Sequence, residues 1–147
     1  MSAQTASKSA RDEFYQRAPH PLHLFLLSGA TCLLVGGFLS DWAYFSSNEI
    51  QWKNVAAWLI FAGLIFGGFA LLWALVDLIR AGYDRGRRVI CFLLLLAAWI
   101  LGIINELVHA KDAWASMPEA LILSGIVAAL ATAATVLGLS AIRARGH

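Results

Sequence analysis

The chain has 147 residues, of which 60% are hydrophobic and only 14% are charged. Soluble domains carry roughly 25% charged residues, so this composition is typical of a membrane protein. The length fits one compact unit, and a net charge of +2 is too small to indicate a nucleic-acid partner. Cys32 and Cys91 lie inside apolar runs and provide neither a disulfide framework nor a metal-binding spacing.

The N-terminal region divides into a polar segment and a long apolar run. Residues 1–18 are rich in serine, alanine and charge, and we predict a flexible cytoplasmic tail there. The apolar run covers about 22–45 and carries Asp41 near its far end. Basic residues before an apolar run are also found in signal peptides, but no small-residue cleavage site follows this one. A membrane helix needs about 20 apolar residues, so we predict a retained transmembrane helix.

Three further apolar runs follow, over about 55–80, 88–109 and 119–142. The buried helices of a soluble bundle would show a polar face with a period of 3.6 residues. Residues 56–76, AAWLIFAGLIFGGFALLWALV, have no such face. The predicted fold is therefore all-α: a polytopic membrane protein with a four-transmembrane-helix bundle over residues 19–143.

The distribution of basic residues predicts the orientation. Four spans place both termini and the loop between the second and third helices on one side of the membrane. That side holds nine of the eleven basic residues, and the opposite side holds only Lys53 and Lys111. The nine are Lys8, Arg11, Arg17, Arg80, Arg85, Arg87, Arg88, Arg143 and Arg145. Because cytoplasmic loops carry the excess of lysine and arginine, we predict an inner-membrane protein with cytoplasmic N- and C-termini.

Small residues recur within the spans, most clearly in the G-x-x-x-G spacing of Gly63 and Gly67. Small residues allow close approach of helix backbones in lipid, where little hydrophobic force drives helices together. Two readings stay open: packing within one bundle, or a face that forms a homo-oligomer.

Polar residues gather near both ends of the predicted spans. The periplasmic candidates are Asp41, Asn105, Glu106, His109 and Asp112. Asn105, His109 and Asp112 follow an i, i+4, i+7 spacing and so fall on one helical stripe. Such a cluster could hold a cation, bind a quinone head group or tie the helix ends together.

The cytoplasmic candidates are His20, His23, Asp77 and Arg80. Asp77 could accept a hydrogen bond from either histidine or from Arg17, or could pair with Arg80. This group could be a structural clamp or a site for a proton or ligand.

The motifs that mark common enzyme classes are absent from the sequence, which contains no Walker loop, G-x-S-x-G, H-E-x-x-H or C-x-x-C. Haem b in a bundle requires two histidines on facing helices at one depth. His20 and His23 lie at one boundary and His109 at the other, with about 30 Å of hydrocarbon between them. We therefore predict no catalytic residues, no metal site and no cofactor.

Several motifs together resemble a known family. They are HPLHLFLLSGA at 20–30, DWAY at 41–44, W-x-x-x-A-x-W-L-I-x-A-G-L-I-F-G at 52–67 and, most specifically, N-x-x-x-H-x-K-D-A-W at 105–114. Over roughly residues 19–142 the chain resembles the bacterial membrane proteins classed as domain of unknown function 2231. The resemblance implies a four-helix inner-membrane protein without an assigned biochemical activity. Related domains occur fused to Rieske-type domains, and relatives are encoded near periplasmic sugar dehydrogenases.

The chain also departs from the family pattern. Many relatives carry a second H-P where this chain has His23-Leu24, and often a histidine where it has Cys91 and Phe92. Both departures argue against a histidine-bound cofactor.

Three functions remain to be compared. The first is a non-enzymatic accessory or anchor subunit for a periplasmic dehydrogenase or Rieske-type protein. The alternative is a small oligomeric proton-coupled transporter or ion-binding protein that uses Asp77 on one side and Asp41 with His109 on the other. A haem b electron carrier is the third, and the difference in depth between the histidines disfavours it.

Overall fold

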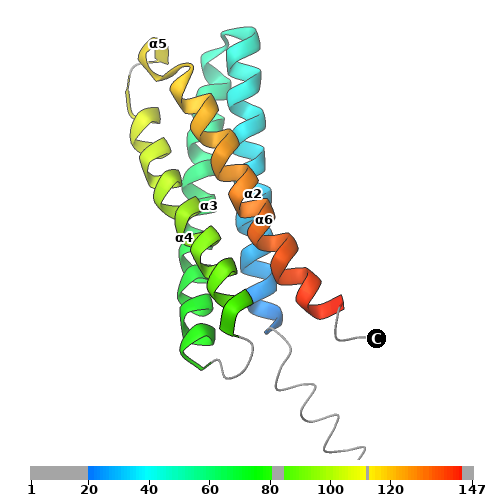
Figure 1. Cartoon of the computed structure of the whole chain (residues 1–147). Coiled ribbons are helices and arrows are strands. Elements are labelled where there is room, and N and C mark those ends of the chain that lie inside the picture. Colours follow the sequence, from blue (N-terminus) through cyan, green and yellow to red (C-terminus); the bar gives the residue numbers. More distant parts are fainter. Residues whose placement is uncertain (1–19, 81–84, 112, 144–147) are drawn as a thin grey trace, which may run out of the picture.

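The computed structural model describes residues 20–80, 85–111 and 113–143. These residues form four long helices, α2 (Pro21–Ser47), α3 (Ile50–Ile79), α4 (Arg85–His109) and α6 (Glu119–Arg143), with a short α5 (Ala113–Ser116) before the last. Figure 1 shows the long helices running side by side, with α5 at the end of the bundle where α4 finishes. The predicted all-α four-helix bundle is confirmed. The predicted tail over 1–18 lies outside the described residues.

Each of the four long helices has the length and apolarity needed to cross a membrane, with mean hydropathies between 1.9 and 2.4. Large apolar side chains point outward along the bundle, among them Phe25, Trp58, Leu72 and Ile79. Ile79 is 76% exposed and Trp58 is 73% exposed. A bundle with such an apolar exterior is stable in lipid rather than in water. The protein is a multi-pass membrane protein.

The connection between α2 and α3 is shorter than the sequence suggested. Asn48 adopts a left-handed conformation, with φ 58°, and its backbone N–H binds the carbonyl oxygen of Tyr44. Asparagine tolerates this conformation better than most residues and is used to end helices. Glu49 precedes the first turn of α3, which begins at Ile50 rather than near residue 55. Lys53 therefore lies on a helix and not in a loop.

Helices α2 and α4 each pack against both α3 and α6. Two apolar clusters fill the interior: Leu34, Ile60, Ala98, Val127 and Ala131 form one, and Leu27, Ala70, Leu95 and Ala134 form the other.

Both residues of the G-x-x-x-G pair are buried within the bundle. A Cβ on Gly63 would meet Leu34 of α2 at 2.9 Å, and one on Gly67 would meet Trp99 of α4 at 3.6 Å. This face of α3 therefore packs against α2 and α4 inside a single chain.

Polar side chains connect the helices at mid-depth. The hydroxyl groups of Thr31 and Thr135 lie 2.7 Å apart and join α2 to α6. The indole N–H of Trp99 donates to the carbonyl oxygen of Leu64 at 3.0 Å and joins α4 to α3. Hydrogen bonds of this kind supplement the close packing that holds membrane helices together.

Candidate functional site

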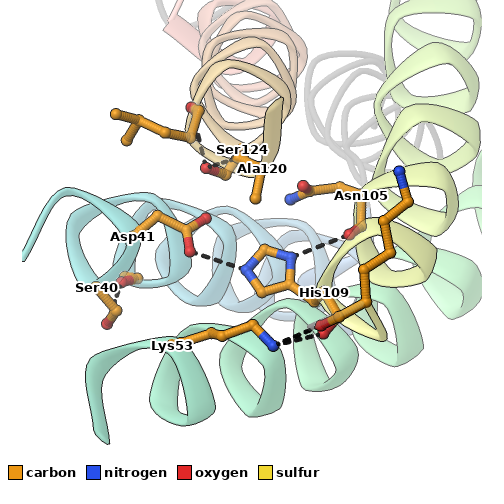
Figure 2. Close-up of polar contacts among 10 residues, drawn as sticks. Ser40, Asp41, Lys53, Asn105, His109, Ala120 and Ser124 are labelled. Atoms are coloured by element: carbon orange, nitrogen blue, oxygen red, sulfur yellow. Dashed lines mark hydrogen bonds and ion pairs between the residues drawn. The ribbon is translucent and has the colours of Figure 1, made fainter. Parts of the chain in front are cut away.

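The most buried polar residues of the bundle meet near the end that carries α5. His109, in the last turn of α4, faces Asp41 of α2, and Nε2 of the imidazole lies 2.8 Å from Oδ1 of the carboxyl group (Figure 2). The exposed fractions of the two side chains are 1% and 0%. Asp41 and His109 therefore form a contact between two helices that solvent does not reach.

The second ring nitrogen determines which atom of His109 carries hydrogen. Nδ1 lies 3.0 Å from the backbone carbonyl oxygen of Asn105, one turn earlier in α4. A carbonyl oxygen only accepts hydrogen bonds, so Nδ1 must donate. The contact between Nε2 and Asp41 then needs one more proton, which is on the imidazole of an ion pair or on the carboxyl group of a neutral pair. In both cases the two side chains together carry no net charge.

A residue from a third helix fixes the end of α4. Nζ of Lys53 donates to the carbonyl oxygens of His109 and Lys111, each at 3.0 Å. The last carbonyl groups of a helix lack partners within it, and a cation there also interacts favourably with the helix dipole. Asp41, Lys53 and His109 thereby connect α2, α3 and α4 at one level. We call the set Asp41, Lys53, Asn105 and His109 the outer polar centre.

The sequence placed Lys53 at the same end of the bundle as Asp41 and His109 but outside the cluster. Its role depends on the two-residue turn at Asn48 and Glu49, which starts α3 early enough for the side chain to reach α4. The tendency of asparagine to adopt a left-handed conformation could have predicted the turn at Asn48. It could not have predicted which carbonyl groups Lys53 would contact.

The predicted periplasmic residues behave differently from one another. Asn105 and His109 are both buried, as their shared stripe suggests. Helix α4 ends at His109, and Asp112 lies outside the described residues. Glu106 does not join the outer polar centre by a hydrogen bond. Its side chain instead lines a groove of about 720 Å³ between α3 and α4, together with Phe61, Leu64, Ile65, Gly68, Phe69, Leu71, Leu72, Trp99, Ile103 and Leu107.

Hydrogen-bonding capacity remains unused in the outer polar centre. Asp41 Oδ2, Asn105 Oδ1 and Asn105 Nδ2 are buried and have no partner in the part of the chain that the structure describes. Asp41 and Asn105 are both 0% exposed. A buried polar group without a partner costs about 1–3 kcal/mol, so three such atoms on two residues of one polar centre are a marked feature of this bundle.

The cytoplasmic candidates form no comparable centre. His20 and His23 pack on Trp73 of α3, with ring centroids 4.9 Å and 6.5 Å from the indole. The backbone carbonyl oxygen of Asp77 accepts a hydrogen bond from Arg88 at 3.1 Å. Across residues 20–80, 85–111 and 113–143 the carboxyl group of Asp77 forms no hydrogen bond or ion pair. Arg80 is exposed after the end of α3, and Arg17 lies outside the described residues.

The two clusters lie at opposite ends of the bundle, since His20 caps the N-terminus of α2 and Asp41 lies near the other end of that helix. Within the described residues no group of three His, Cys, Asp or Glu side chains could hold a metal ion. Because they lie at opposite ends of the bundle, His109 is far from both His20 and His23.

Comparison with known proteins identifies the chain at family level. The family model described as "Predicted membrane protein (DUF2231)" matches residues 19–144. No curated protein and no solved structure matches the chain. The family match includes all four long helices and both polar clusters, and it confirms the resemblance drawn from the motifs. The chain belongs to the predicted membrane protein family designated domain of unknown function 2231.

Proposed function

We propose that this protein is a non-enzymatic accessory subunit of a bacterial inner membrane that anchors a periplasmic redox protein, of the dehydrogenase or Rieske type. The observation that carries the proposal is the outer polar centre. It fixes three transmembrane helices to one another at the end of the bundle that we place in the periplasm. A docking platform is most effective on rigid elements, because a rigid surface loses little conformational freedom when a partner binds.

The orientation rests on charge and on aromatic residues. Arg80, Arg87 and Arg88 lie at the end of the bundle opposite the outer polar centre, and cytoplasmic ends are rich in arginine and lysine. Trp42 and Trp52 lie at the outer end, with exposed fractions of 60% and 44%. Tryptophan is enriched where a membrane meets water. Both observations support cytoplasmic termini.

The burial of Asp41 and His109 favours an anchor over a transporter. A transport site must open to at least one side of the membrane, whereas these two side chains are 0% and 1% exposed. On the cytoplasmic side, Asp77 forms no hydrogen bond or ion pair with His20, His23 or Arg80. The residues that a proton pathway would need are therefore separated by the length of the bundle.

Orientation can be tested by cysteine labelling. In a background in which Cys32 and Cys91 are replaced by alanine, Gln51→Cys and Arg80→Cys place single thiols at opposite ends, and both positions are exposed. A membrane-impermeant maleimide added to spheroplasts should label Gln51→Cys alone, and both variants after lysis. Labelling of Arg80→Cys in intact spheroplasts would reverse the proposed orientation.

The anchor role is tested by purification from native membranes in mild detergent, with a tag at the C-terminus. We expect a periplasmic redox protein to co-purify, identified by mass spectrometry and by its visible absorbance before and after dithionite. Glu49→Lys, at the exposed outer corner, should reduce the yield of this partner, whereas Arg80→Glu at the other end should leave it unchanged. A protein that purifies without any redox partner after cross-linking in cells would refute the proposal.

A further inference from the structure

We propose that the outer polar centre is a binding site for an internal water molecule, held between Asp41 of α2 and Asn105 of α4 beside α6. The water donates a hydrogen bond to Asp41 Oδ2 and accepts one from Asn105 Nδ2. This site lies within a single chain. It does not depend on the proposed anchor role or on any partner protein.

The unpartnered groups of Asp41 and Asn105 point toward the same part of α6. In Figure 2 the amide group of Asn105 and the second carboxyl oxygen of Asp41 both point toward the part of α6 that carries Ala120 and Ser124. The two groups come from different helices, and both residues are fully buried. Ala120 and Ser124 are also buried, at 0% and 2%, so α6 closes the site against lipid.

The surrounding residues that the structure describes leave these groups without a hydrogen-bond partner. The hydroxyl group of Ser124 donates back to its own helix, to the carbonyl oxygen of Ala120 at 2.9 Å. Oδ1 of Asp41 is already used by His109. The remaining oxygen of Asp41 needs a donor, and the amide N–H groups of Asn105 need an acceptor. Buried waters characteristically bind polar groups that have no other partner.

The chemistry of the neighbouring groups favours water over an ion at this site. A sodium ion could bind Asp41 Oδ2 and Asn105 Oδ1, but it would leave the amide N–H groups facing a cation. It would also add positive charge where Lys53 already supplies an ammonium group to the end of α4. A divalent metal needs more anionic ligands than the described residues offer here. A small neutral molecule can donate to the carboxyl oxygen, accept from the amide N–H and add no charge. Water is the molecule of this kind that is always present.

Such a water would give α2 and α4 a second link beside the contact of Asp41 with His109. It would also hold the carboxyl group so that Oδ1 keeps facing the imidazole. Asp41, Asn105 and Ala120 are fully buried, so a water between them is separated from bulk solvent by protein and is retained there. We expect it to persist in the folded bundle in lipid.

The test is water-edited solid-state NMR of the full chain in lipid vesicles, with magnetisation starting on water protons. We expect transfer to the side-chain amide of Asn105 to be several-fold faster than transfer to the indole N–H of Trp99, which donates to the carbonyl oxygen of Leu64 in the middle of the span. The amide of exposed Asn48 provides the fast reference. Transfer to Asn105 as slow as that to Trp99 would overturn the proposal.

A matched pair of variants locates the water. Ala120→Val adds two methyl groups beside the site and should slow transfer to Asn105 to the rate of Trp99. Ala131→Val, at an equally buried position of α6 in the apolar cluster, should leave it unchanged. Equal rates in wild type and Ala120→Val would place the water elsewhere and refute the assignment.

Exchanging sodium for choline in the buffer separates water from a cation. If water is bound, this exchange should not shift the resonances of the side-chain carboxyl carbon of Asp41 or the side-chain amide carbon of Asn105. A sodium-dependent shift at both residues would show that an ion occupies the site and would overturn the proposal.

Discussion

The ammonium group of Lys53 lies 3.0 Å from the backbone carbonyl oxygen of His109, the residue whose imidazole contacts Asp41. Lys53 therefore acts on this pair without touching either side chain, because it fixes the backbone that carries His109. A second bond from the same group to the carbonyl oxygen of Lys111 extends this support past the end of α4. The pair depends on three helices rather than on two.

The Asp41–His109 contact should show strong coupling. Removing one partner of a buried pair leaves the other polar group uncompensated, so Asp41→Leu and His109→Leu should each lower the free energy of unfolding by about 3–5 kcal/mol. The double variant should recover most of this loss, because apolar pairs often replace buried polar pairs without cost. Thermal unfolding in detergent, followed by circular dichroism, measures all three. Additive losses in the double variant would show that the two side chains do not act as a pair.

Lys53→Met should destabilise the bundle by about 1–2 kcal/mol, since the end of α4 loses its cation and two carbonyl groups lose a donor. The substitution keeps most of the apolar stem of the side chain. Lys111→Met is the control, because its ion pair with Glu119 is exposed, with side chains 52% and 63% accessible, and an exposed pair contributes only about 0–1 kcal/mol. Equal effects of the two substitutions in the same unfolding assay would contradict the proposed role of Lys53.

The glycines of the bundle differ in what surrounds them. A Cβ on Gly63 would lie 2.9 Å from Leu34, whereas one on Gly86 would meet nothing within 4 Å. Gly63→Ala should therefore force α2 and α3 apart and cost about 1–3 kcal/mol. Gly86→Ala should be neutral or slightly stabilising, because alanine favours helix. Comparing their unfolding temperatures tests whether this face packs within the chain, and an unaffected Gly63→Ala would argue against that.

Asn48 should tolerate glycine but not a β-branched residue. Its φ of 58° lies in the left-handed region, which costs most residues roughly 1–2 kcal/mol. Asn48→Val should destabilise the protein by about that amount, whereas Asn48→Gly should be close to wild type. Because the turn also sets where α3 begins, the valine variant should weaken the Lys53 contact, which raised hydrogen exchange at residues 110 and 111 would detect. Equal stability of the two variants would show that the turn does not constrain α3.

The sequence was sufficient for the fold because a membrane imposes one requirement on every span. Residues 56–76 have no polar face, and only lipid accommodates such a helix. Depth was also predictable. Asp41 lies near the C-terminal end of α2, and Asn105 and His109 lie near the C-terminal end of α4. Because one span separates α2 from α4, the two helices run in the same direction, and their C-terminal ends lie at the same end of the bundle.

Contacts that depend on rotation and turn geometry could not be predicted. Asn105 and Glu106 are neighbours in sequence, yet Asn105 is fully buried and Glu106 lines the groove between α3 and α4. Asp77 was one possible acceptor for a hydrogen bond from His20 or His23, but both histidines pack on Trp73 instead. Trp73 is one of several aromatic residues in an apolar run, and nothing in its local sequence distinguishes it.

The single proton between His109 and Asp41 has a consequence for an energised membrane. A uniform field exerts no net force on a neutral group, whereas moving one elementary charge across the membrane takes about 2.3 kcal/mol for each 100 mV. Whichever atom holds the proton, the imidazole and the carboxyl group together remain neutral, since Nδ1 already donates to Asn105. The respiratory potential therefore exerts no net force on this pair, and the junction between α2 and α4 should hold equally well in resting and in actively respiring cells.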